Sequence, residues 1–322
     1  MLTVDVVIVG GGPCGLSAAI ECQNIGLTPV VIEKGNIVNA IYNYPTHQTF
    51  FSTSEKLAIG DVPFIIEERK PRRNQALVYY REVVKAKKIQ VNRFEKVMKV
   101  ENKGDDFTVT TDKEVYKTQY VILATGYYDQ PNYMNIPGES LAKVQHYFKE
   151  AHECFDLDVL VIGGKNSAID AALELHKAGA RVTVAYRGSE YSPSIKPWVL
   201  PEFLGLVREG EITMYFNTNV AEIREHEVVL EVDGEMQIIS NDRVFAMTGY
   251  HPDHAFIRAM GVGIDAETGR PQFDAETMET NIDNLFIAGV LAAGNNANEI
   301  FIENGRFHGG MIAAKIAANR MK

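Results

Sequence analysis

The stretch Val4-Asp5-Val6-Val7-Ile8-Val9-Gly10-Gly11-Gly12-Pro13-Cys14-Gly15 opens the chain and decides its fold. Its first half is a short apolar run rich in β-branched residues, which is typical of a buried parallel strand. The run ends in Gly10-x-Gly12-x-x-Gly15, and a helical pattern follows from Leu16 to Ile25. Gly10 permits the tight turn, Gly12 lets the backbone approach a pyrophosphate, and Gly15 lets the helix pack close to the strand.

A second strand and an acidic residue complete this unit. Pro29 to Ile32 is apolar and ends in Glu33, where a carboxylate can accept a hydrogen bond from a ribose hydroxyl. The start of the intervening helix directs N–H groups and the positive end of its dipole at phosphates. A βαβ unit that merely carries glycines is the alternative, and the order of strand, loop, helix, strand and acid argues against it.

The same motif returns in the middle of the chain. Asp158 to Ile162 reads as a strand and is followed by Gly163-Gly164-Lys165-Asn166-Ser167-Ala168, a helix to Ala178 and a strand from Arg181 to Tyr186. Lys165 stands where the second glycine is expected, so its side chain either crowds a pyrophosphate or adds positive charge beside it. The second strand ends in Arg187 rather than an acid, which favours NADP(H) over NAD(H), with a surface arginine as the alternative.

Composition narrows the classes of protein. The chain has 322 residues, 46% of them hydrophobic, which is enough for roughly two domains with their own cores. The formal charge of −10 argues against nucleic-acid or anionic-membrane partners. The three cysteines form neither a CxxC nor a metal-ligand spacing, so we expect no metal and a reducing, cytoplasmic location. We find no apolar run of membrane-spanning length and no signal-peptide pattern.

Turn signals indicate where the domains meet. Tyr120 to Leu123 reads as a buried strand that leads into Ala124-Thr125-Gly126, where a glycine allows close approach to a cofactor. Pro131, Pro137 and Gly138 mark a linker, and Thr248-Gly249-Tyr250 mirrors Thr125-Gly126-Tyr127. We therefore predict a first domain made of 1–126 and 249–322, with a second domain, 127–248, inserted into it.

Several other stretches are less specific. Asn36 to Ser54 lacks periodicity and predicts loops over the first ligand, where Asn39 and Thr46 either bind a polar ring edge or serve ordinary turns. The basic cluster in Glu67 to Arg73 either docks an anion or is a solvated loop. Gly188 to Pro201 holds the single tryptophan, Trp198, and predicts a loop at the mouth of the second site. A long helix is expected from Gly305 to Asn319.

These motifs and their order resemble the flavoproteins with two dinucleotide-binding domains, in their thioredoxin-reductase-like branch. Gly-Gly-Gly-Pro-Cys-Gly at 10–15, Gly-Gly-Lys-Asn-Ser-Ala at 163–168 and the tail from Gly289 to Gly309 are most similar to bacillithiol disulfide reductases of the YpdA type. The resemblance implies an α/β fold of two nested Rossmann-like domains, FAD in the split domain, NADPH in the inserted one, and a homo-oligomer.

The residues expected to hold the cofactors follow from the motifs and this resemblance. For FAD they are Gly10, Gly12, Pro13, Gly15, Glu33, Asn39, Thr46, Val97, Thr125, Gly126, Gly289, Glu299, Ile300 and Phe301. For NADPH they are Gly163, Gly164, Lys165, Asn166, Ser167 and Arg187.

Two departures from the family pattern matter. Thioredoxin reductases carry a redox CxxC in the nicotinamide domain, and this sequence has none there. Many such flavoproteins have Asp after the glycine of the last strand, whereas Val290 stands here, so the ribityl contact must come from elsewhere, with Glu299 as one candidate. The N–H groups of Ile300 and Phe301 are candidates to face the flavin pyrimidine oxygen.

The resemblance implies an NADPH-dependent reductase of a low-molecular-weight disulfide, and two routes stay open for the last step. Either a Cys14 thiolate attacks the disulfide, or reduced flavin attacks the substrate sulfur directly. A ferredoxin or flavodoxin reductase is the second hypothesis, because that branch also lacks CxxC. A flavoprotein that senses nicotinamide nucleotides without turnover is the third.

Overall fold

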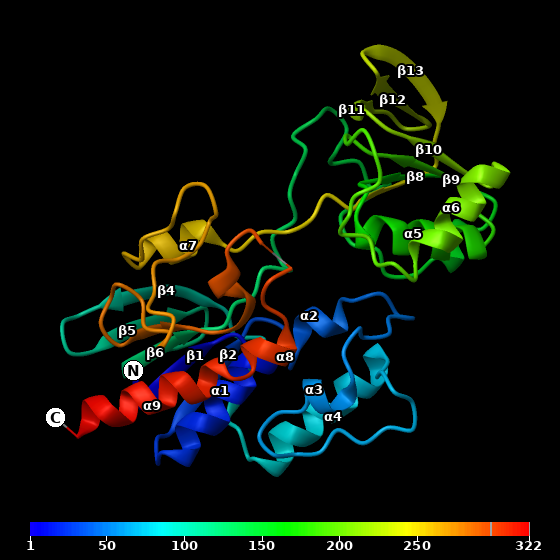
Figure 1. Ribbon diagram of the computed structural model, residues 1–322. Coiled ribbons are helices and arrows are strands. Elements are labelled where there is room, and N and C mark those ends of the chain that lie inside the picture. Colours follow the sequence, from blue (N-terminus) through cyan, green and yellow to red (C-terminus); the bar gives the residue numbers. More distant parts are fainter. Residues whose placement is uncertain (297, 322) are drawn as a thin grey trace. The chain divides into compact units, whose positions relative to one another are not determined.

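A computed structural model describes residues 1–296 and 298–321 of the chain, which form two compact units. The first unit comprises residues 1–43, 47–130 and 250–322, and the second comprises 44–46 and 131–249. Each unit is a mixed α/β structure built on a sheet with parallel strands (Figure 1). The expected α/β class with two Rossmann-like units, one interrupting the other in sequence, is confirmed.

The first unit is organised around a seven-stranded sheet. Six of its strands lie in the order β3 (Val91–Arg93), β2 (Pro29–Glu33), β1 (Leu2–Val9), β6 (Val115–Leu123), β5 (Phe107–Thr111) and β4 (Val97–Asn102), and the seventh, β15 (Leu285–Ile287), pairs with β6 outside this order. β3, β2, β1 and β6 are parallel, whereas β5 and β4 run antiparallel. The central strands are apolar on both faces because helices and further chain cover both sides.

β6 contains the predicted strand from Tyr120 to Leu123 and begins earlier, at Val115. Its first half pairs antiparallel with β5, from Val115 to Thr118, and its second half pairs parallel with β15 (Leu285–Ile287), from Val121 to Leu123. One strand therefore carries both the antiparallel ribbon and the last parallel strand of the sheet. Val7 and Ile8 of β1 and Leu123 of β6, which pairs with β1, are fully buried.

The helices of the first unit begin with α1 (Pro13–Asn24), which lies beside α9 (His308–Arg320) (Figure 1). A Cβ on Gly309 would lie 2.7 Å from the Cα of Ala18, so this glycine permits the close contact of the two helices. The expected long helix from Gly305 is shorter and starts later, because a separate turn, α8 (Ile302–Gly305), precedes it. The remaining helices are α2 (Asn39–Tyr42), α3 (Ser54–Leu57), α4 (Arg73–Ala86), α7 (His254–Ala259) and the 3₁₀ turn η2 (Gly289–Ala293).

The second unit holds a five-stranded parallel sheet and a three-stranded antiparallel one. The parallel sheet runs β10 (Ile212–Tyr215), β9 (Arg181–Ala185), β8 (Asp158–Ile162), β14 (Arg243–Ala246) and β7 (Val144–Gln145). The antiparallel sheet is β11 (Thr218–Ile223), β12 (Glu227–Val232) and β13 (Glu235–Ser240). The helices are α5 (Asn166–Lys177), α6 (Leu200–Glu209) and the 3₁₀ turn η1 (His152–Cys154); the sequence patterns did not predict α6.

β8 shows how this sheet is covered on both faces. Val159 and Val161 pack into a cluster with residues of α5 and α6, whereas Leu160 and Ile162 pack into a second cluster with residues of β11 and β12. Side chains alternate between the faces of a strand, so both sets of β8 must be apolar. The continuous apolar run in the sequence is the consequence.

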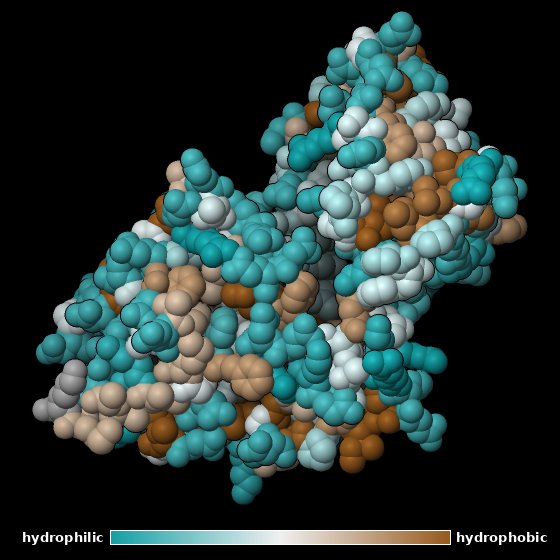
Figure 2. Space-filling view, in the orientation of Figure 1, coloured by the Kyte–Doolittle hydropathy of each residue, from teal (hydrophilic) through white to brown (hydrophobic). Residues whose placement is uncertain are grey.

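The surface is mostly hydrophilic on the face that Figure 2 shows, with apolar side chains scattered between polar ones. Among residues 1–296 and 298–321, no helix is both long and apolar enough to cross a bilayer.

Candidate functional site

The first glycine loop joins β1 to α1 and needs glycine at two of its three motif positions. Gly10 has a φ of +111°, and a Cβ there would lie 2.4 Å from the carbonyl oxygen of Ala124. A Cβ on Gly15 would lie 2.1 Å from the carbonyl oxygen of Gly10. Gly12 is different, because its φ of −75° suits any residue and no atom lies within 4 Å of an added Cβ. The open space above Gly12 is where a pyrophosphate would approach.

The start of α1 is prepared for an anion. Gly12 is the N-cap and offers no side-chain oxygen, and Pro13 at the first helical position lacks an N–H. The following N–H groups of the first turn therefore point to the open space beside the loop.

Glu33 ends β2 and reaches the same loop. Its carboxylate accepts from the Gly11 N–H and from the Gly35 N–H, each at 2.7 Å. Burial raises the pKa of Glu33, and the two N–H donors oppose that rise. Since each carboxylate oxygen has a further lone pair, Glu33 can also accept from a ribose hydroxyl.

The parallel strands of the first unit end together. Val9 is level with Ile32 of β2 and with Leu123 of β6, and Leu123 is level with Ile287 of β15. Ligands of open α/β sheets bind beyond this carboxyl edge. The predicted residues Thr125, Gly126 and Gly289 directly follow these strands, and Thr125 Oγ1 is buried without a hydrogen-bond partner among the described residues. An orphaned hydroxyl beside the loop is what a missing polar ligand would satisfy.

Three other predicted FAD residues lie in different surroundings. The Asn39 side chain packs over Gly35, close to the loop that follows β2. Val97 is buried at the start of β4. Thr46 belongs to the second unit, where its hydroxyl donates to Glu150 at 2.6 Å and its N–H donates to the Lys149 carbonyl at 3.0 Å.

The predicted contacts near the C-terminus already have partners within the chain. The Glu299 carboxylate forms an ion pair with Arg270, and the Phe301 N–H donates to Asn304 Oδ1 at 2.7 Å. Ile300 is half-buried between them. A flavin contact from Glu299 or Phe301 would have to share or replace these bonds.

The second glycine loop repeats the geometry of the first. Gly163 has a φ of +134°, and a Cβ there would lie 2.6 Å from the carbonyl oxygen of Met247, as Gly10 does against Ala124. Lys165 is the N-cap of α5 with a φ of −112° and a ψ of −171°, an extended backbone that any residue adopts. The lysine therefore fits where the fingerprint has its second glycine. A Cβ on Gly164 would meet the Tyr186 ring at 2.3 Å, so this glycine allows the ring to cover the loop.

Positive charge gathers at the carboxyl ends of β8 and β9. Lys165, Ser167 and Arg187 are all exposed there. In the part of the chain that the structure describes, no carboxylate pairs with the Lys165 ammonium or the Arg187 guanidinium. Two unpaired cations on a protein of net charge −10 indicate an anionic ligand at this edge.

Comparison with known proteins agrees with this geometry. The family model described as pyridine nucleotide-disulphide oxidoreductase matches residues 7–289, a span that includes both glycine loops. The chain belongs to this family. It is 67% identical over 320 residues to the bacilliredoxin reductase Bdr of Bacillus subtilis, which covers 98% of each protein.

Solved structures extend the comparison. The bacillithiol disulfide reductase Bdr (YpdA) of Bacillus cereus superposes with a TM-score of 0.97 at 66% identity, covering 98% of this chain and 99% of that one. The thioredoxin reductase of T. acidophilum superposes with a TM-score of 0.79 at 20% identity and covers all of both chains, which shows the shared fold. The chain is thus an oxidoreductase of the pyridine nucleotide-disulphide family.

Cys14 is the cysteine of this oxidoreductase that lies at a glycine loop. Its Sγ would lie 3.0 Å from a Cβ on either Gly289 or Gly305, so the thiol is enclosed by these two glycines. Although the residue keeps a little exposure, burial raises the pKa of its thiol to about 12. The resting side chain is therefore a protonated thiol at neutral pH. His308 lies in the same region, where its Nδ1 accepts from the Gly289 N–H at 3.2 Å, and burial lowers its pKa.

We expect Cys14 to resist alkylation in the native protein at pH 7.5, because the thiolate is the reacting form and its pKa is about 12. Iodoacetamide followed by peptide mass spectrometry measures this, with urea-unfolded protein as the positive control. Rapid labelling of native Cys14 at pH 7.5 would show that the thiol is ionised in the resting state.

Asp170 gives the second unit a pH dependence. It lies on α5, and burial, with Glu174 adding to it, raises the pKa of its carboxyl to about 6 from 3.8. The folded state then binds more protons than the unfolded state between these pH values, so this carboxyl costs stability as the pH rises from about 4 to about 6.

Asp170→Asn should therefore increase the free energy of unfolding at pH 7.5 by about 2 kcal/mol, and the gain should vanish below pH 4. Urea unfolding followed by the fluorescence of Trp198, the one tryptophan in the sequence, reports on this unit. A variant whose gain persists at pH 3.5 would mean that ionisation of Asp170 is not the cause.

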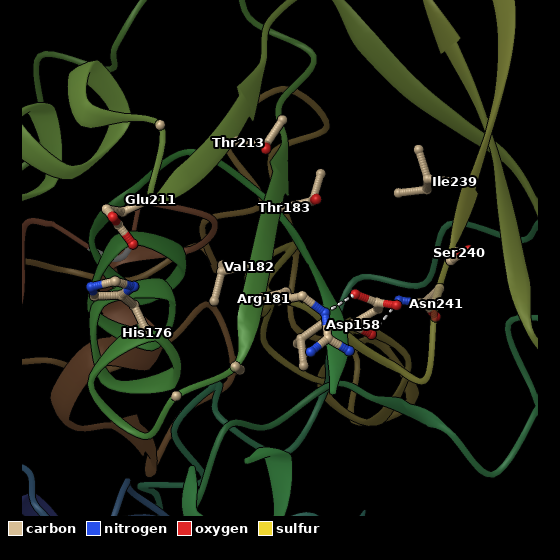
Figure 3. Close-up of a pocket in the computed structure, with 14 residues that line it drawn as sticks. Asp158, His176, Arg181, Val182, Thr183, Glu211, Thr213, Ile239, Ser240 and Asn241 are labelled. Atoms are coloured by element: carbon tan, nitrogen blue, oxygen red, sulfur yellow. Dashed lines mark hydrogen bonds and ion pairs between the residues drawn. The ribbon is translucent and has the colours of Figure 1, made fainter. Parts of the chain in front are cut away.

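A polar cavity of about 440 Å³ lies elsewhere in the second unit (Figure 3). Its lining includes Asp158 at the start of β8, Arg181 at the start of β9 and Thr213 near the start of β10, so it opens at the amino edge of the parallel sheet, away from the Gly163 loop. Its Arg181 is paired with Asp158, and Asn241 donates to the Asp158 carbonyl at 3.3 Å (Figure 3). Arg181 is also paired with Asp156. Since nucleotides bind at the carboxyl edge, this cavity is not the candidate cofactor site.

Sequence reasoning missed two polar contacts at the sites. One is the hydrogen bond from the Gly289 N–H to His308. The other is the pair of hydrogen bonds that the Asn166 side chain makes to the main chain at residues 194 and 196. Both join segments far apart in the sequence, and no local pattern signals them.

Proposed function

We propose that this chain is a flavoprotein that contains FAD and uses NADPH to reduce a low-molecular-weight thiol disulfide. In the overall reaction NADPH, one proton and the disulfide RSSR give NADP⁺ and two RSH. When bound, NADPH supplies a hydride and FAD accepts it and passes the electron pair to the disulfide. The chain's own residues bind and orient these groups.

The first unit fits FAD. The open space above Gly12, the uncapped start of α1, the Glu33 carboxylate and the orphaned Thr125 hydroxyl together match a diphosphate flanked by a ribose. Residues 1–126 and 249–322 would then form the FAD domain.

The second unit fits NADPH. The Gly163 loop provides the turn, Lys165 and the start of α5 face the pyrophosphate position, and Arg187 follows β9 where the ribose lies. A guanidinium binds a 2′-phosphate through paired hydrogen bonds, and an acid at this place would repel it. The inserted domain, 127–248, would therefore select NADPH.

The proposal that the electron acceptor is a disulfide of this kind rests on the 67% identity to bacilliredoxin reductase and on the TM-score of 0.97 against bacillithiol disulfide reductase. These two relatives point to a bacillithiol disulfide, or to a bacilliredoxin bearing one, as the oxidant. The cysteines of this chain stand at 14, 22 and 154, so a CxxC relay to thioredoxin is not available.

Two routes remain for the electron pair. In one, reduced flavin would give its electron pair directly to the disulfide. In the other, the Cys14 thiol would lose its proton and attack one sulfur of RSSR, which would form a mixed disulfide and release RS⁻, and reduced flavin would supply the electron pair that breaks the mixed disulfide. The enclosed, protonated thiol of the resting protein favours the direct route. Cys14→Ala with full flavin content separates them, because retained turnover excludes the mixed disulfide and lost turnover requires it.

Stopped-flow spectroscopy tests the function as a whole. We expect rapid bleaching of the flavin band by NADPH and its return when bacillithiol disulfide is added. Return with ferredoxin or flavodoxin alone would instead support a carrier reductase, and a flavin that NADPH does not bleach would remove the proposal.

The basic cluster in Glu67 to Arg73 gives little support to the alternative function, a ferredoxin or flavodoxin reductase. Arg73 is buried and donates to Asn74 and to the Tyr42 carbonyl, and Arg72 pairs with Glu68. Much of the cluster's charge is thus engaged within the chain rather than presented to a partner.

A further inference from the structure

A segment of the second unit, residues 192–198, is fastened to the first residue of α5 by one side chain. Asn166 Nδ2 donates to the Ser194 carbonyl oxygen at 2.8 Å, and Asn166 Oδ1 accepts from the Lys196 N–H at 2.9 Å. Both halves of the amide are used, so the main chain of the segment is fixed to the helix start at two points. We call this segment the clamp.

The clamp is also held from its other side. Ile195 is 4% exposed and packs in the core beneath α5 and α6. The hydroxyls of Ser192 and Ser194 lie 2.8 Å apart, and the Val199 N–H donates to the Lys196 carbonyl at 3.0 Å. A segment with a buried anchor and closed hydrogen bonds is a fixed element rather than a mobile loop.

The clamp brings a cation to the start of α5. Lys196 Nζ lies 5.4 Å from the centre of the Trp198 ring. The Lys196 ammonium also lowers the pKa of Asp170, against the larger effect of burial, and Asp170 lies one turn along α5 from Asn166. The main chain of Lys196 is thus bonded to the first residue of α5, and its ammonium lies over the Trp198 ring and close enough to Asp170 to act on that carboxyl.

We propose that the clamp is part of the nucleotide site and that its Lys196 binds the pyrophosphate of the dinucleotide. Asn166 is then the positioning residue that holds Lys196 there. The inference rests on the proposed binding of NADPH to this unit. The pyrophosphate is favoured over the 2′-phosphate because Lys196 is bonded to the first residue of the helix, whereas the ribose lies at the end of β9, beside Arg187. Asn166 thus acts through the clamp and not by touching the nucleotide.

The test uses the fact that NADP⁺ and NAD⁺ share the pyrophosphate and differ in the 2′-phosphate. Binding of each oxidised nucleotide to the flavin-loaded protein is measured by calorimetry, so that no turnover occurs. Lys196→Met should weaken both by about tenfold, the size expected for one charged hydrogen bond, and leave their ratio unchanged. Lys196→Arg should restore binding, and Thr213→Val, on β10 at the opposite edge of the sheet, should have no effect.

Asn166→Ala should weaken both nucleotides by a similar factor, and the double variant with Lys196→Met should be no weaker than the worse single variant. A second readout needs no nucleotide. Trp198 is the one tryptophan in the sequence and is 61% exposed, and its fluorescence anisotropy should fall in Asn166→Ala as the clamp loosens.

The outcomes separate the two proposals. If the wild-type protein binds neither nucleotide, the proposed function fails and this inference fails with it. If the wild type binds both and Lys196→Met changes nothing, or weakens NADP⁺ alone, the pyrophosphate assignment is overturned while the function stands. Unchanged anisotropy in Asn166→Ala would overturn the positioning role.

Discussion

Gly12→Ala is expected to give a folded protein that binds FAD more weakly than the wild type. The backbone at Gly12 is extended, with a φ of −75° and a ψ of 175°, and no atom of the chain lies within 4 Å of an added Cβ. The methyl group would instead occupy the space where the pyrophosphate approaches. Overpacking of this kind costs roughly 1–3 kcal/mol, so affinity for FAD should fall by on the order of tenfold to a hundredfold.

The measurement is the ratio of flavin absorbance to protein absorbance after gel filtration, followed by titration of the apoprotein with FAD. Circular dichroism and the melting temperature should match those of wild-type apoprotein, because the chain itself does not need glycine at this position. Gly10→Ala is the matched contrast: its Cβ would lie 2.4 Å from the Ala124 carbonyl oxygen at a φ of +111°, so it should fail to fold. An affinity for FAD in Gly12→Ala equal to that of the wild type would show that the pyrophosphate lies elsewhere.

The second large effect is expected from Arg187→Ala. Arg187 is exposed beyond β9, and no carboxylate pairs with it among the residues described. If it binds the 2′-phosphate, its loss should raise KM for NADPH by roughly 10- to 100-fold, the range for a charged, paired hydrogen bond. KM for NADH should change little, because NADH has no phosphate at this position.

Steady-state rates with each nucleotide check this, and Arg187→Lys should recover part of the loss, since a point charge replaces the paired geometry. Equal losses for NADPH and NADH would contradict the assignment, because they would indicate a contact that the two nucleotides share. Lys196→Met is expected to show that shared pattern, so the two variants form a matched pair.

Much of the fold could be predicted because its signals are local. The apolar runs at 4–9 and 158–162, the glycines after them and the residues Glu33 and Arg187 all act within one βαβ unit. Each glycine loop was found because Gly10 and Gly163 must adopt positive φ and approach a carbonyl oxygen, which only glycine permits. Local rules were less reliable where partners were distant. The predicted strand starts at Tyr120, whereas β6 starts at Val115, because the two halves of β6 have different neighbours, one antiparallel and one parallel.

Some residues of the candidate site lay beyond that reach. That Thr46 contacts the first ligand stays a prediction, and the bonds that its N–H and hydroxyl make to Lys149 and Glu150, about 100 positions away, could not be predicted from the sequence. Cys14 has a sequence context that favours a thiolate, at a helix start, and the packing of Gly289 and Gly305 around it has the opposite effect.

The sequence alone determined that this chain has two glycine loops between a strand and a helix, with an acid after the second strand of one unit and an arginine after that of the other, because the necessary residues are adjacent and their backbone geometry admits few alternatives. The tertiary structure decided which groups those loops can use. It enclosed the Cys14 thiol between two glycines from the far end of the chain, and it committed the Asn166 amide to a segment 28 and 30 residues away. Burial and hydrogen bonding between distant segments set pKa values and fix loops, and neither is encoded in any short stretch of sequence.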